Sequence, residues 1–425
     1  MSVPWRPLLS GEAAARARAA ARDVAAVTTR GAPPHAAGIA PEAFPIWDNT
    51  LHSGRAGQCL LHAYLALSGD GETCSDAALD LLDQATDAAP GLKMGTSLFL
   101  GFPGIAWAAS HLENRLFTAD EDGNRPVDEI LAAALSREDW EGGFDLFDGL
   151  VGVGAYALER LPRPSAARLL ETVVSRLAGR AERTPDGATF HSPQRVLPLN
   201  YQEHYPDGAY ILGFGQGIAG VVALLGAACQ AGVATGEARP LLEATISWLF
   251  ARELPAGGLY RFPHFYLPGL EPYLTRVAWC TGDLGIAAAL LVAARGAGVP
   301  AWEAEARRIA LVAAARTVEN GRVPDAGLCH GASGAGHVFN RLYQTTGEEE
   351  LGRAARFWFE RALDLREPGL GVAGFRTFAS PSPPTPEPGF LTGATGIGLA
   401  LLAACTPVEP AWDRLLLLST LAPRI

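Results

Sequence analysis

Apolar runs with helical spacing recur along the chain, and each run is opened by two glycines that are separated by two residues. Successive copies begin about 47 to 68 residues apart, which leaves room for two helices and their loops in each repeat. The chain is therefore predicted to consist of seven helical hairpins. The seven copies stand at Gly54/Gly57, Gly101/Gly104, Gly149/Gly152, Gly217/Gly220, Gly282/Gly285, Gly331/Gly334 and Gly393/Gly396.

The two helices of each predicted hairpin differ in character. The runs behind the glycines are apolar almost all round, as in GIAAALLVAA at residues 285–294, and such helices belong in an interior. The stretches between them, such as SAARLLETVVSRLAGRAE at residues 165–182, are amphipathic. Seven hairpins of this kind close naturally into an α/α toroid, in which an outer barrel of seven helices surrounds an inner barrel of seven. We therefore expect an all-α fold that forms a single domain over residues 1–425.

The glycines are expected where each inner helix begins, since the missing side chain lets the helix starts crowd together at one mouth of the barrel. The first N–H groups of these helices would then face the cavity and favour anions there. Three segments interrupt the helices, at residues 184–208, 253–276 and 376–389. They are rich in proline, glycine or aromatic residues, and we interpret them as loop insertions, with short strands or extended chain.

Composition narrows the range of functions. The 425 residues are 48% hydrophobic and 19% charged, which is typical of a globular protein with a large core. A net charge of −11 argues against nucleic acid as a partner, because no basic face is available for phosphates. The acidic balance suits a basic peptide, although solubility alone also explains it. With neither a signal peptide nor a membrane span in the sequence, the expected location is the cytoplasm.

Two cysteines and one histidine stand at equivalent places in adjacent repeats. Cys280 in AWCTGDLG and Cys329–His330 in LCHGASG each directly precede the glycine region that opens an inner helix. The toroid places all three side chains at the same mouth, and two cysteines with one histidine form a familiar zinc site with one open position. The other cysteines are interpreted as small buried apolar residues; they are Cys59, Cys74, Cys229 and Cys405.

These motifs resemble those of the LanC-type lanthionine cyclases, and the resemblance covers essentially the whole chain. RVAWCTGDLG matches the family pattern R-x-x-W-C-x-G, and CHG follows one repeat later, among the glycine-opened repeats. The resemblance implies an α/α toroid that holds Zn²⁺ through Cys280, Cys329 and His330. It also implies addition of cysteine thiols to dehydroalanine or dehydrobutyrine in a dehydrated precursor peptide, in a complex with a dehydratase and a transporter.

The resemblance assigns further roles. Arg276 matches the family's arginine and would stabilise the enolate oxygen that forms during addition, whereas a salt bridge that holds the loop is the alternative. Asp145 in FDLFDGLVG matches the family's aspartate and would orient an acid/base partner or bind substrate. Gln216 stands in GQGIAG where the family has its acid/base histidine, and an amide does not exchange protons near neutral pH. Water, His204 or His264 then remain as proton sources.

Two other functions stay open at this point. An α/α-toroid glycosidase needs two carboxylates, for which Asp145, Asp148, Asp207 and Asp283 are candidates, but it leaves the two cysteines and the histidine without a role. A non-catalytic or weakly active partner in a peptide-modification complex is the other alternative, since Gln216 replaces the expected histidine.

Overall fold

The computed structural model describes residues 4–29, 42–138, 140, 142–197, 202–203, 205–269, 271–272, 274–377 and 386–419. Its contacts divide the chain into two compact units. The first comprises Met1–Val127 and Val323–Trp412, and the second comprises Asp128–Arg322 and Asp413–Ile425. The expectation of a single domain therefore stays a prediction, and each unit is described by itself.

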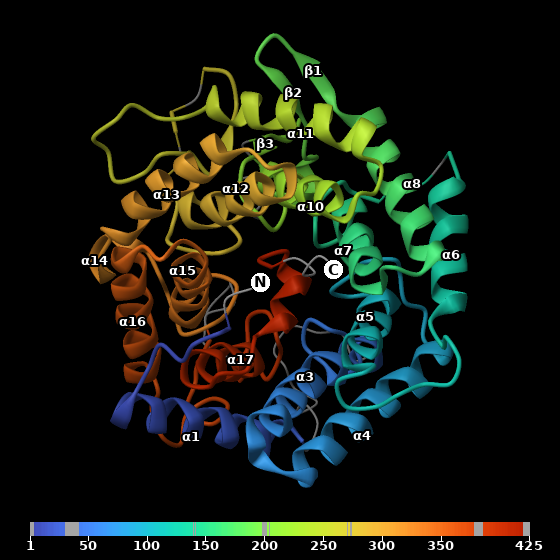
Figure 1. The fold of residues 1–425 in the computed structure, drawn as a ribbon, viewed down its shortest axis with the longest axis vertical. Coiled ribbons are helices and arrows are strands. Elements are labelled where there is room, and N and C mark those ends of the chain that lie inside the picture. Colours follow the sequence, from blue (N-terminus) through green and yellow to red (C-terminus); the bar gives the residue numbers. More distant parts are fainter. Residues whose placement is uncertain are drawn as a thin grey trace. The chain divides into compact units, whose positions relative to one another are not determined.

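The first unit pairs nearly fully buried helices with helices that are buried on one face. In Figure 1, α1 runs along α17, α4 along α3 and α16 along α15. The buried helices are α3 (Arg55–Leu65), α5 (Phe102–Leu112), α15 (Ala332–Thr346) and α17 (Ala394–Cys405). The helices buried on one face are α1 (Gly11–Thr28), α4 (Glu72–Ala88) and α16 (Glu349–Asp364), and the short α2 spans Phe44–Trp47.

The second unit repeats this arrangement, with α11 covering α10 and α13 covering α12 (Figure 1). Its buried helices are α7 (Leu150–Arg160), α10 (Ile218–Ala231) and α12 (Asp283–Ala297). Those that cover them are α6 (Arg125–Ser136), whose first residues belong to the other unit, α8 (Pro164–Arg180), α11 (Thr235–Phe250) and α13 (Pro300–Ala314); α14 spans Val318–Gly321. All seven glycine-opened runs are thus helices, as the sequence predicted.

The paired glycines allow the loop before each buried helix to fold back onto the first turn of that helix. A Cβ on Gly334 would overlap the carbonyl oxygen of Leu328, six residues earlier. The same fold-back brings loop carbonyls to the helix start, so that the N–H of Ala332 donates to the oxygen of Asp325 over 2.8 Å. In α7 the N–H of Leu150 donates to the oxygen of Gly143 over 3.0 Å.

The expectation that the first N–H groups of these helices face a cavity unpaired is therefore wrong for α7 and α15. The next two N–H groups of each helix are also taken by carbonyls of the preceding loop. A favourable anion site at these two helix starts is consequently not available, because the donors that would make it are already paired.

Short antiparallel strand pairs lie at two of the predicted insertions. β1 (Glu182–Thr184) pairs with β2 (Gly187–Thr189), and β3 (Tyr210–Ile211) pairs with β4 (Phe265–Tyr266), although β3 and most of β1 fall just outside the predicted bounds. The second pair lies beside a small buried cluster formed by Leu197, Ala209, Ile211 and Phe265. The β3–β4 pair holds the 253–276 insertion against β3, the strand that precedes Gln216. Most of the predicted 376–389 segment, and His204, lie outside the described residues.

A buried ion pair fastens α6 to α7 in the second unit. The Arg160 side chain is fully buried, and its Nη2 lies 2.7 Å from Oδ2 of Asp128, which is 2% exposed. The Asp128 carboxylate also accepts hydrogen bonds from the hydroxyls of Tyr156 (2.7 Å) and Ser165 (2.6 Å). A charge this deeply buried needs such a complete set of partners.

None of the helices in the described ranges is both long and apolar enough to cross a membrane.

Candidate metal centre

Cys280 lies in the loop before α12 and is held by the loop that leads into α10. Its carbonyl oxygen accepts hydrogen bonds from the N–H of Phe214 (2.8 Å) and the N–H of Gly215 (3.2 Å). This approach requires a glycine at position 213, since a Cβ there would lie 2.5 Å from the Cys280 oxygen. The GFG sequence before Gln216 thus fixes the backbone of Cys280.

Cys329 and His330 lie in the corresponding loop before α15. The N–H of Cys329, a buried residue, donates to the carbonyl of Leu391 over 2.8 Å. The N–H of Gly327, two residues before Cys329, donates to Oδ1 of Asp325 over 2.8 Å. This hydrogen bond shapes the start of the loop. These two hydrogen bonds hold the backbone of the loop that carries the Cys329 thiol and the His330 imidazole.

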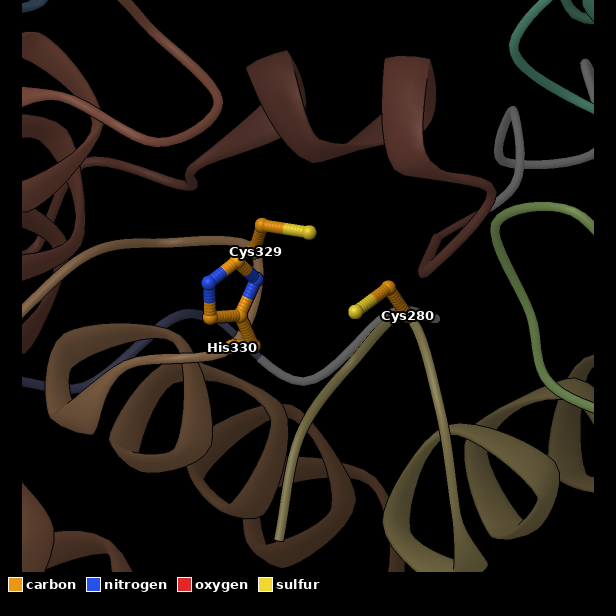
Figure 2. A group of neighbouring side chains, drawn as sticks. All are labelled: Cys280, Cys329 and His330. Carbon is orange, nitrogen blue, oxygen red and sulfur yellow. The ribbon is translucent and has the colours of Figure 1, made fainter. Parts of the chain in front are cut away.

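The structure brings the three predicted side chains together (Figure 2). One donor atom from each of Cys280, Cys329 and His330 lies within 4.8 Å of the other two. In tetrahedral zinc sites, Zn–S distances of about 2.3 Å place two thiolate sulfurs about 3.8 Å apart. The donors therefore need to move only slightly to hold one ion, and both their number and their chemistry fit zinc. Among the residues described, no other histidine, cysteine, aspartate or glutamate set of three meets the same criterion.

Asp145 shapes the loop before α7. Its side chain is buried, and Oδ1 accepts the N–H of Phe147 over 2.8 Å and the N–H of Asp148 over 3.0 Å. Burial raises the pKa of the Asp145 carboxyl, and the hydrogen bond from the Asp148 N–H opposes that rise. One oxygen of the carboxylate is therefore used by the loop itself, and a role toward an acid/base partner or substrate stays a prediction.

The residue before Gln216, Gly215, is hydrogen-bonded to the loops that carry two of the other candidate residues. Gly215 donates its N–H to Cys280, as above, and accepts the N–H of Leu146 over 3.2 Å. Leu146 directly follows Asp145, so one residue beside Gln216 connects the loops of Asp145 and Cys280. The half-buried amide of Gln216 stands at this junction.

Arg276 makes no ion pair with any residue that the structure describes. Whether Arg276 serves the chemistry or holds its loop stays a prediction. Its guanidinium and the Cys280 thiol are both electrostatic neighbours of His264. Burial lowers the pKa of His264 to about 4; Cys280 opposes this shift, and Arg276 adds to it. The imidazole of His264 is therefore neutral at neutral pH.

The comparisons with known proteins show the family and the fold of this chain. The family model for lanthionine synthetase C-like proteins matches residues 45–417, which is most of the chain. The chain belongs to this family. A comparison with curated protein sequences finds no match. Among solved structures, nisin cyclase matches with a TM-score of 0.73 over 88% of this chain and 93% of that one, at 19% sequence identity. At that identity the likeness establishes the fold class, which is the predicted α/α toroid.

This lanthionine synthetase C-like chain also has site residues that sequence reasoning missed. Phe147 is half-buried, and its ring centroid lies 6.3 Å from that of Trp279, the residue before Cys280. A Cβ on Gly215 would overlap the Phe147 ring, so the ring packs on the backbone beside Gln216. The sequence indicates this packing only through Gly215, the second glycine of GFGQG, because the start of α10 does not require a glycine there.

The family assignment removes the glycosidase alternative, and the structure shows what two of its candidate carboxylates do. Asp145 accepts backbone N–H groups of its own loop. Asp283 is fully buried, and its two oxygens accept the N–H groups of Arg261 (2.9 Å) and Phe262 (3.0 Å). Both carboxylates thus hold backbone.

Proposed function

We propose that the chain is a zinc-dependent peptide cyclase, which forms lanthionine and methyllanthionine rings in a dehydrated precursor peptide. In each ring a cysteine thiol of the peptide adds to a dehydroalanine or dehydrobutyrine of the same peptide. The observation that supports this most is the grouping of Cys280, Cys329 and His330 within 4.8 Å in a member of the lanthionine synthetase C-like family. A dehydratase must act first, because the acceptor residues arise from serine and threonine by loss of water.

Cys280, Cys329 and His330 would hold the zinc. When bound, zinc lowers the pKa of a peptide thiol, which is otherwise near 8.5, and makes it a thiolate nucleophile. The chain's two cysteines enter such a site as thiolates and offset the charge of the dication. A site with this donor set would leave a peptide thiolate nucleophilic.

Arg276 would stabilise the charge that develops during the addition. A C–S bond forms at the β-carbon, the carbon–carbon double bond shifts, and negative charge reaches the amide oxygen as an enolate. The α-carbon then takes a proton, which balances the proton lost from the thiol. The guanidinium of Arg276 offers several N–H donors in a planar array, which suits a developing oxyanion.

Replacing Arg276 by methionine is expected to lower the cyclisation rate by about 10²-fold, because one donor to a developing oxyanion is lost. The zinc content is expected to stay at that of the wild type, since Arg276 is not among the three clustered donors. Single-turnover kinetics with a dehydrated precursor peptide and metal analysis of the same samples measure both quantities. An unchanged rate would contradict the proposed role of Arg276.

Gln216 would bind the peptide through its amide, with water as the proton source for the α-carbon. Replacing Gln216 by histidine is expected to leave the rate unchanged or to raise it by up to about 10²-fold, since a positioned acid/base contributes at least that much. The rate is measured against pH, because an active histidine adds a titration near neutral pH. The control is Gln216→Ala, which removes the amide and adds no acid. Complete loss of activity in Gln216→His would show that the glutamine itself is required.

The decisive test of the proposed function is an assay of free thiols. The purified protein is incubated with its dehydrated precursor peptide, and the remaining thiols are counted by alkylation and mass spectrometry. We expect thiols to disappear faster than in a control without protein. Thiols that persist at the control rate, in a sample that binds the peptide, would instead support the alternative of a non-catalytic peptide-binding partner.

A further inference from the structure

Arg316 is a buried cation in the segment that joins α13 to α14, outside the residues already described at the site. It is 2% exposed, and Nη2 donates to the carbonyl oxygens of Thr275 (2.8 Å), Asn320 (2.8 Å) and Gly321 (3.4 Å). Its guanidinium carbon lies 4.2 Å from the centroid of the Tyr260 ring. Nε and Nη1 are buried and have no hydrogen-bond partner in the described part of the chain. One nitrogen therefore makes all three hydrogen bonds.

These hydrogen bonds bracket Arg276. Thr275 directly precedes Arg276, and its carbonyl is held by Arg316. Val277 directly follows, and its N–H donates to the Gly321 carbonyl over 2.9 Å. Arg316 thus holds one flank of Arg276 directly and the other flank through the α14 backbone. The Arg276 guanidinium extends from a backbone that is fixed on both sides.

The loop that carries Arg276 ends at Asp283, which is a second buried charged residue. Asp283 holds the backbone of Arg261 and Phe262, as described above, and stands three residues after Cys280. Arg316 and Asp283 are electrostatic neighbours, so the buried cation has an anion near it. The loop from Thr275 to Asp283, which carries both Arg276 and Cys280, is held at each end by a charged side chain.

Burying the charge of Arg316 costs desolvation free energy, which indicates that the residue has a specific role. A buried ion pair can often be replaced by packed apolar residues with no loss of stability, so stability alone does not explain why Arg316 and its neighbour Asp283 are charged. The three hydrogen bonds of Arg316 Nη2 all go to backbone oxygens, at Thr275 beside Arg276 and at the end of α14. Because a misplacement of about 1 Å can lower a rate by about 10²-fold, such a clamp has a direct effect on catalysis.

We infer that Arg316 is a positioning residue, which sets the place of the Arg276 guanidinium by clamping the backbone on both sides of it. This inference rests on the proposed cyclase function, in which Arg276 stabilises the enolate. It concerns only the placement of Arg276, and it assigns Arg316 no role toward the metal ligands.

The test compares Arg316→Met, which keeps the apolar stem but removes the donor, with Arg316→Lys. For Arg316→Met we expect kcat to fall by about 10- to 10²-fold, with KM and zinc content within about twofold of the wild type. Because a single nitrogen makes all three hydrogen bonds, a lysine ammonium can replace it, and Arg316→Lys should recover most of the lost kcat. The control is Arg322→Met: Arg322 is exposed and donates Nη1 to the neighbouring Leu274 carbonyl over 2.9 Å, so little change is expected.

A double variant separates positioning from general destabilisation. If Arg316 acts through Arg276, adding Arg316→Met to Arg276→Met lowers kcat no further. Additive losses would overturn the inference, as would full activity in Arg316→Met. If Arg316→Met does not fold, the lysine variant decides, because failure to retain kcat in a folded, zinc-loaded Arg316→Lys protein contradicts the clamp.

Amide hydrogen exchange distinguishes failure of this inference from failure of the proposed function. Exchange at Val277 is expected to be faster in Arg316→Met than in the wild type and to be restored in Arg316→Lys, whether or not the protein cyclises peptides. An inactive wild type with this exchange pattern overturns the cyclase function but leaves the clamp. An active wild type with unchanged exchange at Val277 overturns the clamp alone.

Discussion

Cys280→Ala is expected to lose its zinc and to cyclise a dehydrated precursor peptide about a thousandfold more slowly, or not at all. The substitution leaves only Cys329 and His330 in the cluster, and two ligands do not make a stable zinc site. Activation by a metal contributes several kcal/mol to such a reaction, and each 1.36 kcal/mol is a factor of ten in rate. Without the metal, the peptide thiol is only a few per cent ionised near pH 7.

The measurement combines metal analysis with the free-thiol assay, and the matched control is Cys229→Ala. Cys229 is a half-buried thiol on α10 that does not belong to the cluster. That variant should keep about one zinc per chain and nearly the full rate. If Cys280→Ala still held one zinc per chain, the assignment of Cys280 as a ligand would be wrong. If it lost the zinc but kept its rate, zinc would be structural and the proposed chemistry would fail.

Local patterns in the sequence were sufficient to predict the helices of this fold. A glycine pair marks the start of each buried helix, and an apolar run follows it, as in α17, where every residue from Ala394 to Ala404 is buried. A helical period and a helix-opening glycine are read within about 15 residues, so they need no knowledge of the rest of the chain. The grouping of Cys280 with Cys329 and His330 followed in the same way, because the two motifs occupy equivalent places in adjacent repeats.

The polar details of the site could not be predicted in this way. Sequence reasoning gave the α15 helix start free donors, whereas the carbonyl of Asp325 accepts the first of them. It offered Asp145 for chemistry or for orientation, whereas one carboxylate oxygen holds the loop. It gave Arg316 no role at all. Each of these contacts depends on which carbonyl of a folded loop lies within about 3 Å of a given donor. The hydrophobic period does not encode that distance.

The same distinction explains why Gln216 is still the most informative residue of the site. Its backbone is held through the neighbouring Gly215, which hydrogen-bonds to both Cys280 and Leu146. Its chemistry is unlike that of the histidine which the family pattern has at this place. Besides His330, the structure puts His264 near Cys280. His264 comes from the 253–276 insertion and directly precedes β4, which pairs with β3. No pattern within the repeats indicates this proximity.

Asp128→Ala is expected to destabilise the protein by about 3–5 kcal/mol, which is the largest effect on stability that we predict. The substitution removes the carboxylate that pairs with the fully buried Arg160 guanidinium and that accepts hydrogen bonds from Tyr156 and Ser165. Urea unfolding of both proteins at equal zinc concentration measures the difference. The control is Asp364→Ala, which breaks an exposed ion pair with Arg16 and should cost less than about 1 kcal/mol.

A double variant shows whether the cost comes from the unpaired charge. Replacing Asp128 by leucine together with Arg160 by methionine removes both charges and keeps most of the packed volume. It should recover much of the stability lost in Asp128→Ala, because a buried ion pair contributes little more than apolar residues of similar volume. A loss below about 1 kcal/mol in Asp128→Ala would mean that water or another side chain reaches Arg160. An unrecovered double variant would instead assign the loss to the hydrogen bonds from Tyr156 and Ser165.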